Sequence, residues 1–379
     1  MIKRLTYMLL SFVLLACGTD GSETTNTVDK DDTGNNNNPV DTSALVKDAE
    51  RKPFYKFNPV SSLPTAEVTS EEQRLAFGNW SAELPTFTLT FPEGESKRVI
   101  MEYTMGSFGS GPAEYDYTTM LFIRDKATGA MHEITRAITP FGGMFDASWQ
   151  KHFYIDVTEF RSLLQGDVEF AYFYGGFDNS EERAHSFTVR FMLYDGTPER
   201  ELVGIVPLYD SFNNGNSGYR GWAYGVPGHD IEAKVRLGDR SVTIPEGVES
   251  MELRLSITGH GHDMGIFPDI EGYKPQNMAE FVENSYTFNI NGVTQKATGR
   301  IFYSNADNYL QMGTYNYDRA NWAPGNPTNV QWWSIDTAAI VDGKLTIDID
   351  LPRFESSFQA PNAEGVAQYI VMADLFLYR

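Results

Sequence analysis

The chain is poor in cysteine, with Cys17 as the single example among 379 residues. One thiol cannot form a disulfide within the chain, so a small fold held by disulfides is excluded and the folded part must rely on core burial. Basic side chains are also in the minority, at 30 against 51 acidic ones, which gives a net charge of -21. Such an acidic surface repels nucleic acid, so no nucleic-acid partner is expected.

Helix signals and long apolar runs are scarce as well. The best helix candidate is Thr158–Leu164, which begins with a capping threonine and ends before Gly166. The apolar stretch Met8–Ala16 is too short to span a bilayer as a helix, but it follows Lys3-Arg4 and fits the hydrophobic part of a secretory signal. No other stretch reads as a membrane segment.

The run Leu14–Gly18 resembles a bacterial lipobox, in which the cysteine is lipid-modified and becomes the first residue of the mature chain. The alternative is an ordinary cleaved signal peptide that contains a cysteine. We therefore predict that residues 1–17 are a lipoprotein signal, that Cys17 is the lipidation site, and that the lipid is the only membrane attachment. Gly18 is not the aspartate associated with inner-membrane retention, which favours an exported lipoprotein of the outer membrane or cell surface.

Residues 18–43 are rich in Thr, Asp, Asn and Gly and have few apolar side chains, which predicts a disordered spacer. Beyond it, short runs of alternating apolar and polar residues predict strands, and three Asp-Gly or Asn-Gly dipeptides predict hairpin turns. The pattern is typical of an all-β sandwich or jelly roll, with domains 44–198 and 199–379. The predicted strands are 87–91, 119–123, 152–157, 168–174, 186–194, 251–258, 285–290, 345–351 and 368–377, and the predicted turns are Asp195-Gly196, Asn291-Gly292 and Asp342-Gly343.

Several stretches, in the same order along the chain, resemble the bacterial peptide-N-glycosidase F family of secreted amidases. The resemblance implies two adjacent antiparallel eight-stranded jelly rolls with an active site between them, and hydrolysis of the bond between asparagine and an N-linked glycan. It also implies N-glycoproteins or glycopeptides as substrates, a monomer, and no cofactor. The stretches are Ala127–Gly129, Ile138–Phe141, Ile155–Leu164, Gly196–Pro198, Val206-Pro207, Ile257–His262, Ala279-Glu280 and Asp318–Gly325.

Two carboxylates are the candidate catalytic residues. Amide hydrolysis needs an activated water and a proton for the departing nitrogen, and a pair of carboxyl groups can supply both. Asp116 falls on the family's essential aspartate and Glu280 on a second carboxylate of the same cleft. Without the resemblance, Asp116 reads as part of a solvated acidic turn and Glu280 as an ordinary loop glutamate. If residues 114–116 are extended, Glu114 projects to the same face as Asp116 and is a candidate substrate-binding residue.

Other candidate binding residues lie in the second half of the chain. Asp318-Arg319 matches a family element whose arginine reaches the sugar or the catalytic groups, and an arginine there favours ionised carboxylates or clamps a substrate oxygen. A plain loop salt bridge is the alternative. Trp322 and the stretch Tyr219–Tyr224 carry aromatic rings that stack on sugars or pack in the core.

The chain also departs from the family. Gly175 stands where a further cleft glutamate is expected, and Tyr117 stands where an arginine follows the essential aspartate. His260 and Phe177 stand where cleft tryptophans are expected, and the family's disulfide cysteines are absent. These changes imply an altered glycan preference. They also leave open a second reading, a glycan-binding surface lipoprotein that has lost the chemistry.

A third reading comes from His260 and His262, whose spacing places both imidazoles on one face of a strand. The family's fold resembles that of copper-dependent monooxygenases, which use such a pair, and Met312 or Met264 then supplies a sulfur ligand. The alternative is that His262 is a cleft residue and His260 stacks on a sugar. The histidines of the first half, at 132, 152 and 185, show no pairing that forms the second copper site.

Overall fold

The computed structural model describes residues 41–51, 59–75, 84–94, 96–176, 182–210, 222–223, 237–260, 280–281, 283–351 and 368–379. Cys17, the signal segment and most of the predicted spacer lie outside the described residues. Val40–Arg379 form one compact unit. Among the described residues, no helix is long and apolar enough to span a membrane. The helices described are short 3-10 turns, namely η1 (Thr42–Ala44), η2 (Gly142–Met144), η3 (Thr158–Leu163) and η4 (Thr337–Ala339).

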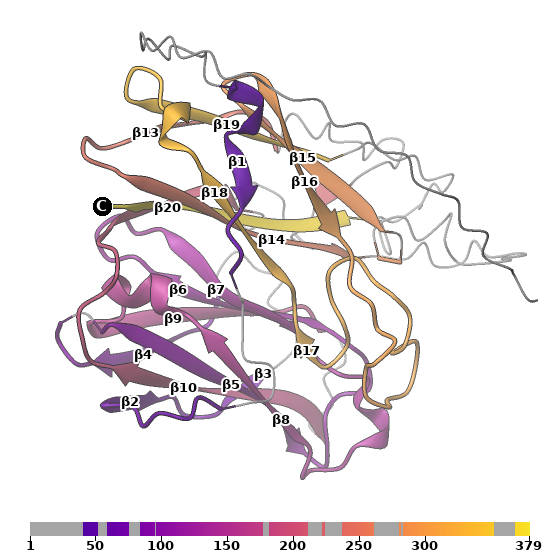
Figure 1. Cartoon of the computed structure of the whole chain (residues 1–379). Coiled ribbons are helices and arrows are strands. Elements are labelled where there is room, and N and C mark those ends of the chain that lie inside the picture. The colour runs from indigo at the N-terminus through magenta and orange to yellow at the C-terminus, as the bar shows by residue number, and fades with distance from the viewer. Residues whose placement is uncertain are drawn as a thin grey trace, which may run out of the picture. The chain divides into compact units, whose positions relative to one another are not determined.

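The strands form four antiparallel sheets, stacked as layers from the bottom to the top of Figure 1. The first has the order β2-β10-β5-β8 with β3 beside β10, and the second has the order β17-β7-β6-β9-β4. The third has the order β1-β18-β14-β20-β11 with β12 beside β20, and the fourth has the order β13-β19-β15-β16. The all-β prediction is confirmed, whereas two eight-stranded jelly rolls stay a prediction.

Nine of the twenty described strands lie within a few residues of the predicted runs, and the other eleven, among them β5 and β7, were not among the predicted strands. In the first two sheets the strands are β2 (Ala66–Thr69), β3 (Gln73–Leu75), β4 (Thr86–Phe91), β5 (Arg98–Gly109), β6 (Thr118–Arg124), β7 (Met131–Ile138), β8 (Gln150–Asp156), β9 (Gly166–Tyr174), β10 (Arg183–Tyr194) and β17 (Asn326–Pro327). In the other two they are β1 (Val46–Asp48), β11 (Leu202–Asp210), β12 (Trp222–Ala223), β13 (Arg240–Thr243), β14 (Ser250–His260), β15 (Asn284–Ile290), β16 (Val293–Ile301), β18 (Val330–Ile335), β19 (Lys344–Asp350) and β20 (Gln368–Tyr378).

Burial follows the layer in which a strand lies. β15 and β19 in the outer fourth sheet alternate between buried and more exposed positions, because one face packs on the core and the other faces solvent. β6 and β14 in the inner sheets are buried at nearly every position, because both faces are covered. Three apolar clusters fill the spaces between layers, and the one between the inner sheets joins Met120 and Phe122 to Ile370 and Met372.

Two of the three predicted hairpin turns are correct. Asn291-Gly292 joins β15 to β16 with φ angles of 50° and 79°, as a tight hairpin with two left-handed residues requires. Asp342-Gly343 likewise has φ angles of 50° and 70° and closes a bridge between Val341 and Lys344. The prediction at Asp195-Gly196 was wrong as a hairpin, because β10 pairs within the first sheet and β11 within the third.

The predicted helix at 158–164 is the 3-10 helix η3, and its cap differs from the expectation. Val157 occupies the cap position, while the Thr158 hydroxyl bonds the Asp156 carboxylate at 2.5 Å. Two strands also cross the predicted boundary near 198: β1 pairs with β18 of the third sheet, and β17 pairs with β7 of the second. The division into domains 44–198 and 199–379 stays a prediction.

Candidate active site

Asp116 lies in an irregular segment just before β6. Residues 114–115 bend, so the extended conformation that would place Glu114 and Asp116 on one face does not form. Backbone bonds hold the segment instead: Tyr117 N–H donates to Thr139 Oγ1 at 2.8 Å, and Gly142 N–H donates to the Ala113 carbonyl at 3.1 Å. The Asp116 backbone is therefore fixed between two anchored neighbours, and its side chain is 16 % exposed.

Glu280 and Arg319 are brought together by backbone pairing of distant segments. Ala320 N–H donates to the Glu280 carbonyl at 2.8 Å, and Gly259 N–H donates to the Ala320 carbonyl at 3.1 Å. Arg319 also exchanges both backbone hydrogen bonds with Tyr303, at 2.8 and 3.1 Å. The end of β14, the 280–281 turn and the 318–322 segment thus lie side by side.

The Arg319 guanidinium lies between the two candidate carboxylates and is fully buried. Its Nη2 is 3.9 Å from Asp116 Oδ2, and its Nε is 3.4 Å from Glu280 Oε1. Three further bonds orient it: Nη1 donates to the carbonyls of Thr314 and Tyr317 at 2.7 and 3.0 Å, and Nη2 donates to Thr314 Oγ1 at 2.7 Å. The planar fork therefore fixes a positive charge between two carboxylates from opposite halves of the chain.

Trp322 and His260 pack beneath this arginine. The guanidinium carbon lies 4.6 Å from the centre of the Trp322 ring, and the His260 ring stacks on the same indole at 5.3 Å between centres. His260 Nε2 is 2.7 Å from Thr258 Oγ1. Burial, together with the charges of Arg136 and Arg319, holds the pKa of His260 well below its usual range, so the ring is neutral. With exposures of 5 % and 3 %, His260 and Trp322 support the arginine from within the protein.

The remaining predicted binding residues that the structure describes are exposed. Asp318 is exposed, and its carboxylate accepts from Asn305 N–H at 3.0 Å in the turn before Arg319. Glu114 is exposed on the outer surface, and Met312 is 50 % exposed. His262 lies outside the described residues, as do Met264 and Phe177. Among the residues that the structure describes, no three His, Cys, Asp or Glu side chains gather as a metal-binding group.

The two departures near Asp116 have clear structural consequences. Tyr117 is buried, with its ring edge-on to Tyr174 at 5.5 Å and to His185 at 6.4 Å, so it belongs to the core of the first two sheets. Gly175 donates its N–H to the Thr118 carbonyl at 2.8 Å. A methyl group at Gly175 would lie no closer than 3.4 Å to any neighbour, so the backbone there can accept a Cβ atom.

Sequence reasoning missed a buried polar chain that supports the site. Arg136 of β7 donates to Glu133 at 2.7 Å, to the Thr258 hydroxyl at 2.6 Å and to the Ile370 carbonyl at 2.9 Å. Thr258 in turn bonds His260, so the second sheet is linked to the stack beneath Arg319. A Glu and an Arg three residues apart inside an apolar strand were the available signal, because such charges are rarely buried unless paired.

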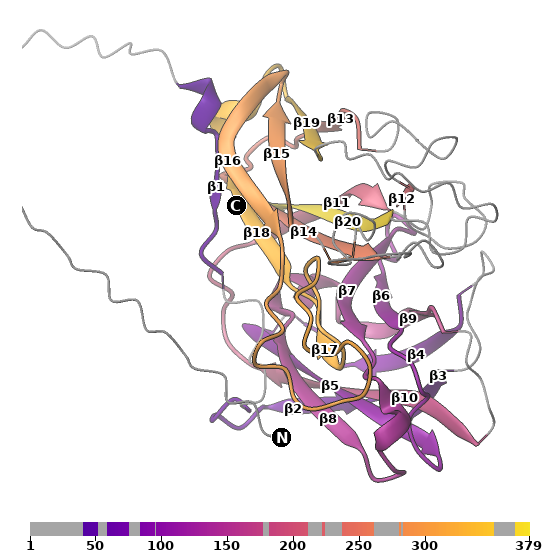
Figure 2. The same ribbon diagram turned by 90° about the vertical axis from the view of Figure 1, so that its right-hand side faces the viewer.

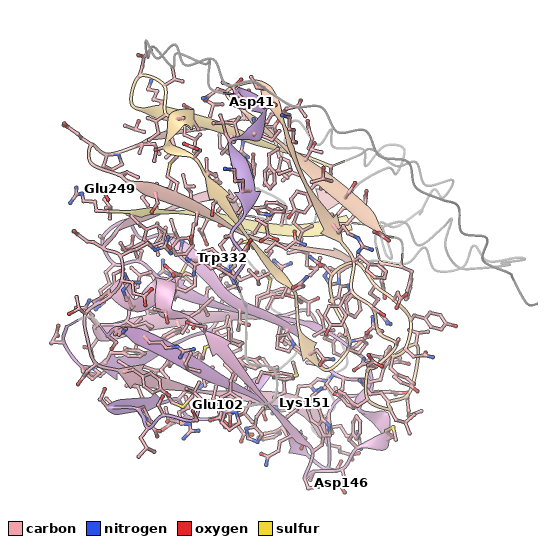
Figure 3. All side chains as sticks on the ribbon, in the orientation of Figure 1. Asp41, Glu102, Asp146, Lys151, Glu249 and Trp332 are labelled. Carbon is pink, nitrogen blue, oxygen red and sulfur yellow. The ribbon has the colours of Figure 1, made fainter. Side chains whose placement is uncertain are left out.

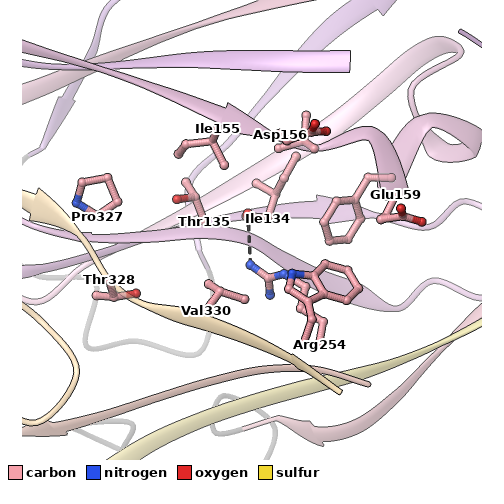
Figure 4. A pocket seen from close by; sticks show the side chains of 12 residues that line it. Ile134, Thr135, Ile155, Asp156, Glu159, Arg254, Pro327, Thr328 and Val330 are labelled. Atoms are coloured by element: carbon pink, nitrogen blue, oxygen red, sulfur yellow. Dashed lines mark hydrogen bonds between the residues drawn. The ribbon is translucent and has the colours of Figure 1, made fainter. Parts of the chain in front are cut away.

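The cavity drawn in Figure 4 lies elsewhere, between the second and third sheets. It has a volume of about 30 Å³, room for roughly two water molecules, and is too small for a sugar. Arg254 reaches into it and donates to the Ile134 carbonyl at 3.2 Å, the dashed line in Figure 4.

Comparison with known proteins agrees with this picture. Residues 230–374 match the family model described as peptide-N-glycosidase F, C terminal. The chain is 27 % identical over 262 residues to a peptide-N(4)-(N-acetyl-beta-D-glucosaminyl)asparagine amidase F of Elizabethkingia miricola, covering 68 % of this chain and 69 % of that protein.

Solved structures show the same fold. A peptide-N-glycosidase F from Flavobacterium meningosepticum superposes with a TM-score of 0.63 at 21 % identity, covering 83 % of this chain and 95 % of that one. PNGF-II superposes with a TM-score of 0.57 at 16 % identity, covering 82 % and 65 %. In sequence and in fold, the chain is similar to the peptide-N-glycosidase F proteins.

Proposed function

We propose that this protein is a peptide-N-glycosidase, an amidase that hydrolyses the bond between asparagine and the proximal N-acetylglucosamine of an N-linked glycan. The carrying observation is that Asp116 and Glu280, from opposite halves of the chain, lie against the same buried guanidinium of Arg319. A plain surface salt bridge would not bury the arginine completely or orient it with three further hydrogen bonds.

The chemistry follows from these three groups. Asp116 accepts a proton from a water molecule as that water attacks the amide carbon. The carbon–nitrogen bond then breaks, and the proton passes through Glu280 to the departing nitrogen. Arg319, which is fully buried, holds the two carboxylates in place from inside the protein. The products are a glycosylamine and a polypeptide in which the asparagine has become an aspartate.

The location belongs to the same proposal. A lipid on Cys17 and a polar spacer of residues 18–40 would hold the folded unit outside the membrane, within reach of N-glycoproteins or glycopeptides of the surroundings. Labelling the intact cells with a palmitate analogue tests this step, since Cys17→Ser abolishes incorporation if Cys17 is the lipidation site.

Mass spectrometry of an N-glycopeptide incubated with the protein tests the chemistry. We expect free glycan and a peptide carrying aspartate, with kcat reduced at least about 100-fold by Asp116→Asn or Glu280→Gln. Glu283→Gln is the matched control, because Glu283 follows Glu280 closely but pairs with the exposed Arg300. Undiminished activity of Asp116→Asn would show that the wrong carboxylate has been assigned.

The absent side chain at Gly175 supports one second candidate, a glycan-binding protein without hydrolysis. That reading predicts binding of glycans with no aspartate formed on high-mannose, complex or core-fucosylated substrates. Equilibrium binding of the free glycans, measured beside the hydrolysis assay, separates the two functions.

A further inference from the structure

More than half of the large exposed apolar side chains lie on three segments of the described chain. Nine large hydrophobic residues have exposures from 37 % to 91 %. Single exposed residues of this kind are ordinary, but a group of them marks an interaction surface. Five of the nine belong to one group, which we call the apolar rim: Tyr115, Met144, Leu310, Met312 and Tyr317.

The segments that carry the rim contact each other. Phe141 N–H donates to Gln311 Oε1 at 3.0 Å, which joins η2 to the connection between β16 and β17. A methyl group placed on Gly143 would lie 3.0 Å from the Met312 sulfur and 3.7 Å from Glu114 Cγ. Figure 2 shows the connection, in orange, descending from β16 past β17 to the level of β5 and β8. Residues far apart in the sequence therefore form one surface.

This connection is held firmly against the first sheet. Lys151 of β8 donates to the Gly325 carbonyl and to Asn326 Oδ1, each at 3.1 Å, and its Nζ lies 3.7 Å from the centre of the Tyr309 ring. Lys151 and Asp146, both labelled in Figure 3, mark this end of the molecule. The rim is thus presented on an anchored scaffold.

The rim borders the candidate active site. Tyr115 directly precedes Asp116, and the carbonyl of Tyr317 accepts a hydrogen bond from Arg319 at 3.0 Å. The Tyr317 ring also meets the ring of Phe281, the residue after Glu280, at 6.0 Å between centres. A substrate whose reacting atoms lie at the carboxylates would continue over the rim.

We propose that the apolar rim binds the polypeptide on either side of the glycosylated asparagine, and that it prefers apolar flanking residues over acidic ones. The inference rests on the proposed amidase function, in which the substrate is a polypeptide as well as a sugar. Methionine and tyrosine suit this partner, because they adapt to varied side chains and bury large apolar areas.

Charge complementarity gives the direction of the preference. The exposed carboxylates of Glu114, Asp146 and Asp318 lie on the same segments, and the chain as a whole carries a net charge of -21. Acidic flanking residues are repelled by these groups, whereas apolar and basic ones are not.

Two glycopeptides that differ only in their flanking residues test the proposal, one with leucine and phenylalanine and one with glutamate. We expect kcat/KM to be at least about tenfold higher for the apolar peptide, and Met144→Ser/Met312→Ser to lower kcat/KM for the apolar peptide while the value for the glutamate peptide, which the carboxylates set, stays the same. The control is Leu63→Ser/Val341→Ser, which changes two exposed side chains outside the rim and should leave the preference intact. Circular dichroism and thermal unfolding establish that both variants fold.

Binding measurements separate a failed rim from a failed enzyme. Fluorescence anisotropy of a labelled, glycan-free apolar peptide should show weaker binding to the rim variant than to the parent, while binding of free glycan stays the same. If both glycopeptides are hydrolysed at the same rate, the proposal that the rim binds the polypeptide is refuted, and the proposed amidase function stands. If neither is hydrolysed but the apolar peptide still binds selectively, the amidase function is refuted, and the proposal about the rim stands. A lower sedimentation mass of the rim variant would instead make the surface an interface between copies, which also refutes the proposal.

Discussion

Replacing Arg319 tests whether the buried arginine organises the site. Arg319→Met removes the charge between Asp116 and Glu280 while keeping a side chain of similar length. Asp116 and Glu280 then lose the cation that they share, and the carbonyls of Thr314 and Tyr317 lose their donor. Removing one partner of a buried, hydrogen-bonded ion pair typically costs about 3–5 kcal/mol of unfolding free energy. We expect a loss of about 4 kcal/mol in urea denaturation, within that range.

The matched control is Arg300→Met. The Arg300–Glu283 pair is shorter, at 2.6 Å, than either contact of Arg319. Its side chains are 64 % and 49 % exposed, however, so water replaces whatever the pair loses. We expect no measurable change in the free energy of unfolding of this variant, although a ranking of these ion pairs by distance alone would make Arg300–Glu283 the strongest.

Arg319→Lys separates charge from geometry. A single ammonium keeps the charge but cannot serve Thr314, Tyr317 and both carboxylates at once. We expect intermediate stability and a kcat that falls about 100-fold, as for loss of a preorganised electrostatic group. The reasoning is refuted if the free energy of unfolding of Arg319→Met lies within about 1 kcal/mol of that of the parent. The ion pairs of Arg319 would then contribute no more than exposed ion pairs do.

Three further outcomes are expected. Burial lowers the pKa of Lys151 to about 7, below its value in the unfolded chain. Between pH 7 and pH 9 the folded state therefore loses this proton while the unfolded state keeps it, and the free energy of unfolding should rise by about 2 kcal/mol. The Lys151→Met variant should not show this rise. Gly325→Ala should lower the free energy of unfolding by about 2–3 kcal/mol, because φ is 73° and the new methyl group would lie 1.8 Å from the Tyr309 hydroxyl. Gly292→Ala has a similar φ of 79° but no neighbour within 4 Å, so it should lower the free energy of unfolding by about 1 kcal/mol. His260→Phe should keep most of the activity because stacking on the indole survives, whereas His260→Ala should lower kcat at least about tenfold.

Each of these has a decisive contrary result. Parallel pH curves of unfolding for the parent and Lys151→Met would show that the amine keeps its proton in the folded state. Equal losses for the two glycine variants, measured by urea denaturation, would place the whole cost in the backbone rather than in the Tyr309 contact. Complete inactivity of His260→Phe would show that an imidazole nitrogen is itself required, as a metal ligand would be.

Much of the secondary structure was predictable, because strand signals are local. Alternating runs such as 285–290 and the dipeptide Asn291-Gly292 act within a few residues, and their strands and turn are where the pattern placed them. Asp195-Gly196 carries an equally strong local signal, but the next strand pairs in another sheet. A turn dipeptide fixes where the chain bends, and the partner that the following strand finds is decided by the packing of the sheets.

The candidate site was likewise predictable only in part. The family resemblance singled out Asp116, Glu280 and Arg319 from the sequence, and the structure places both carboxylates against the arginine. The resemblance made His260 and Trp322 candidates for stacking on a sugar, with core packing as the alternative for Trp322, and the structure stacks the two rings on each other beneath the arginine. Whether an aromatic ring faces solvent or core depends on which segments cover it, and a sequence motif does not contain that information.

By itself, the sequence determined the all-β class, nine of the twenty described strands and the acidic charge, and it singled out two carboxylates and an arginine as candidates. Those features depend on local periodicity or on residue identity, which folding does not change. Only the tertiary structure decided that Arg319 is wholly buried between the carboxylates, that Arg136 supports it through Thr258 and His260, and that Met144 and Met312 share one surface. These are contacts between segments far apart in the chain, and they exist only because the sheets pack on one another.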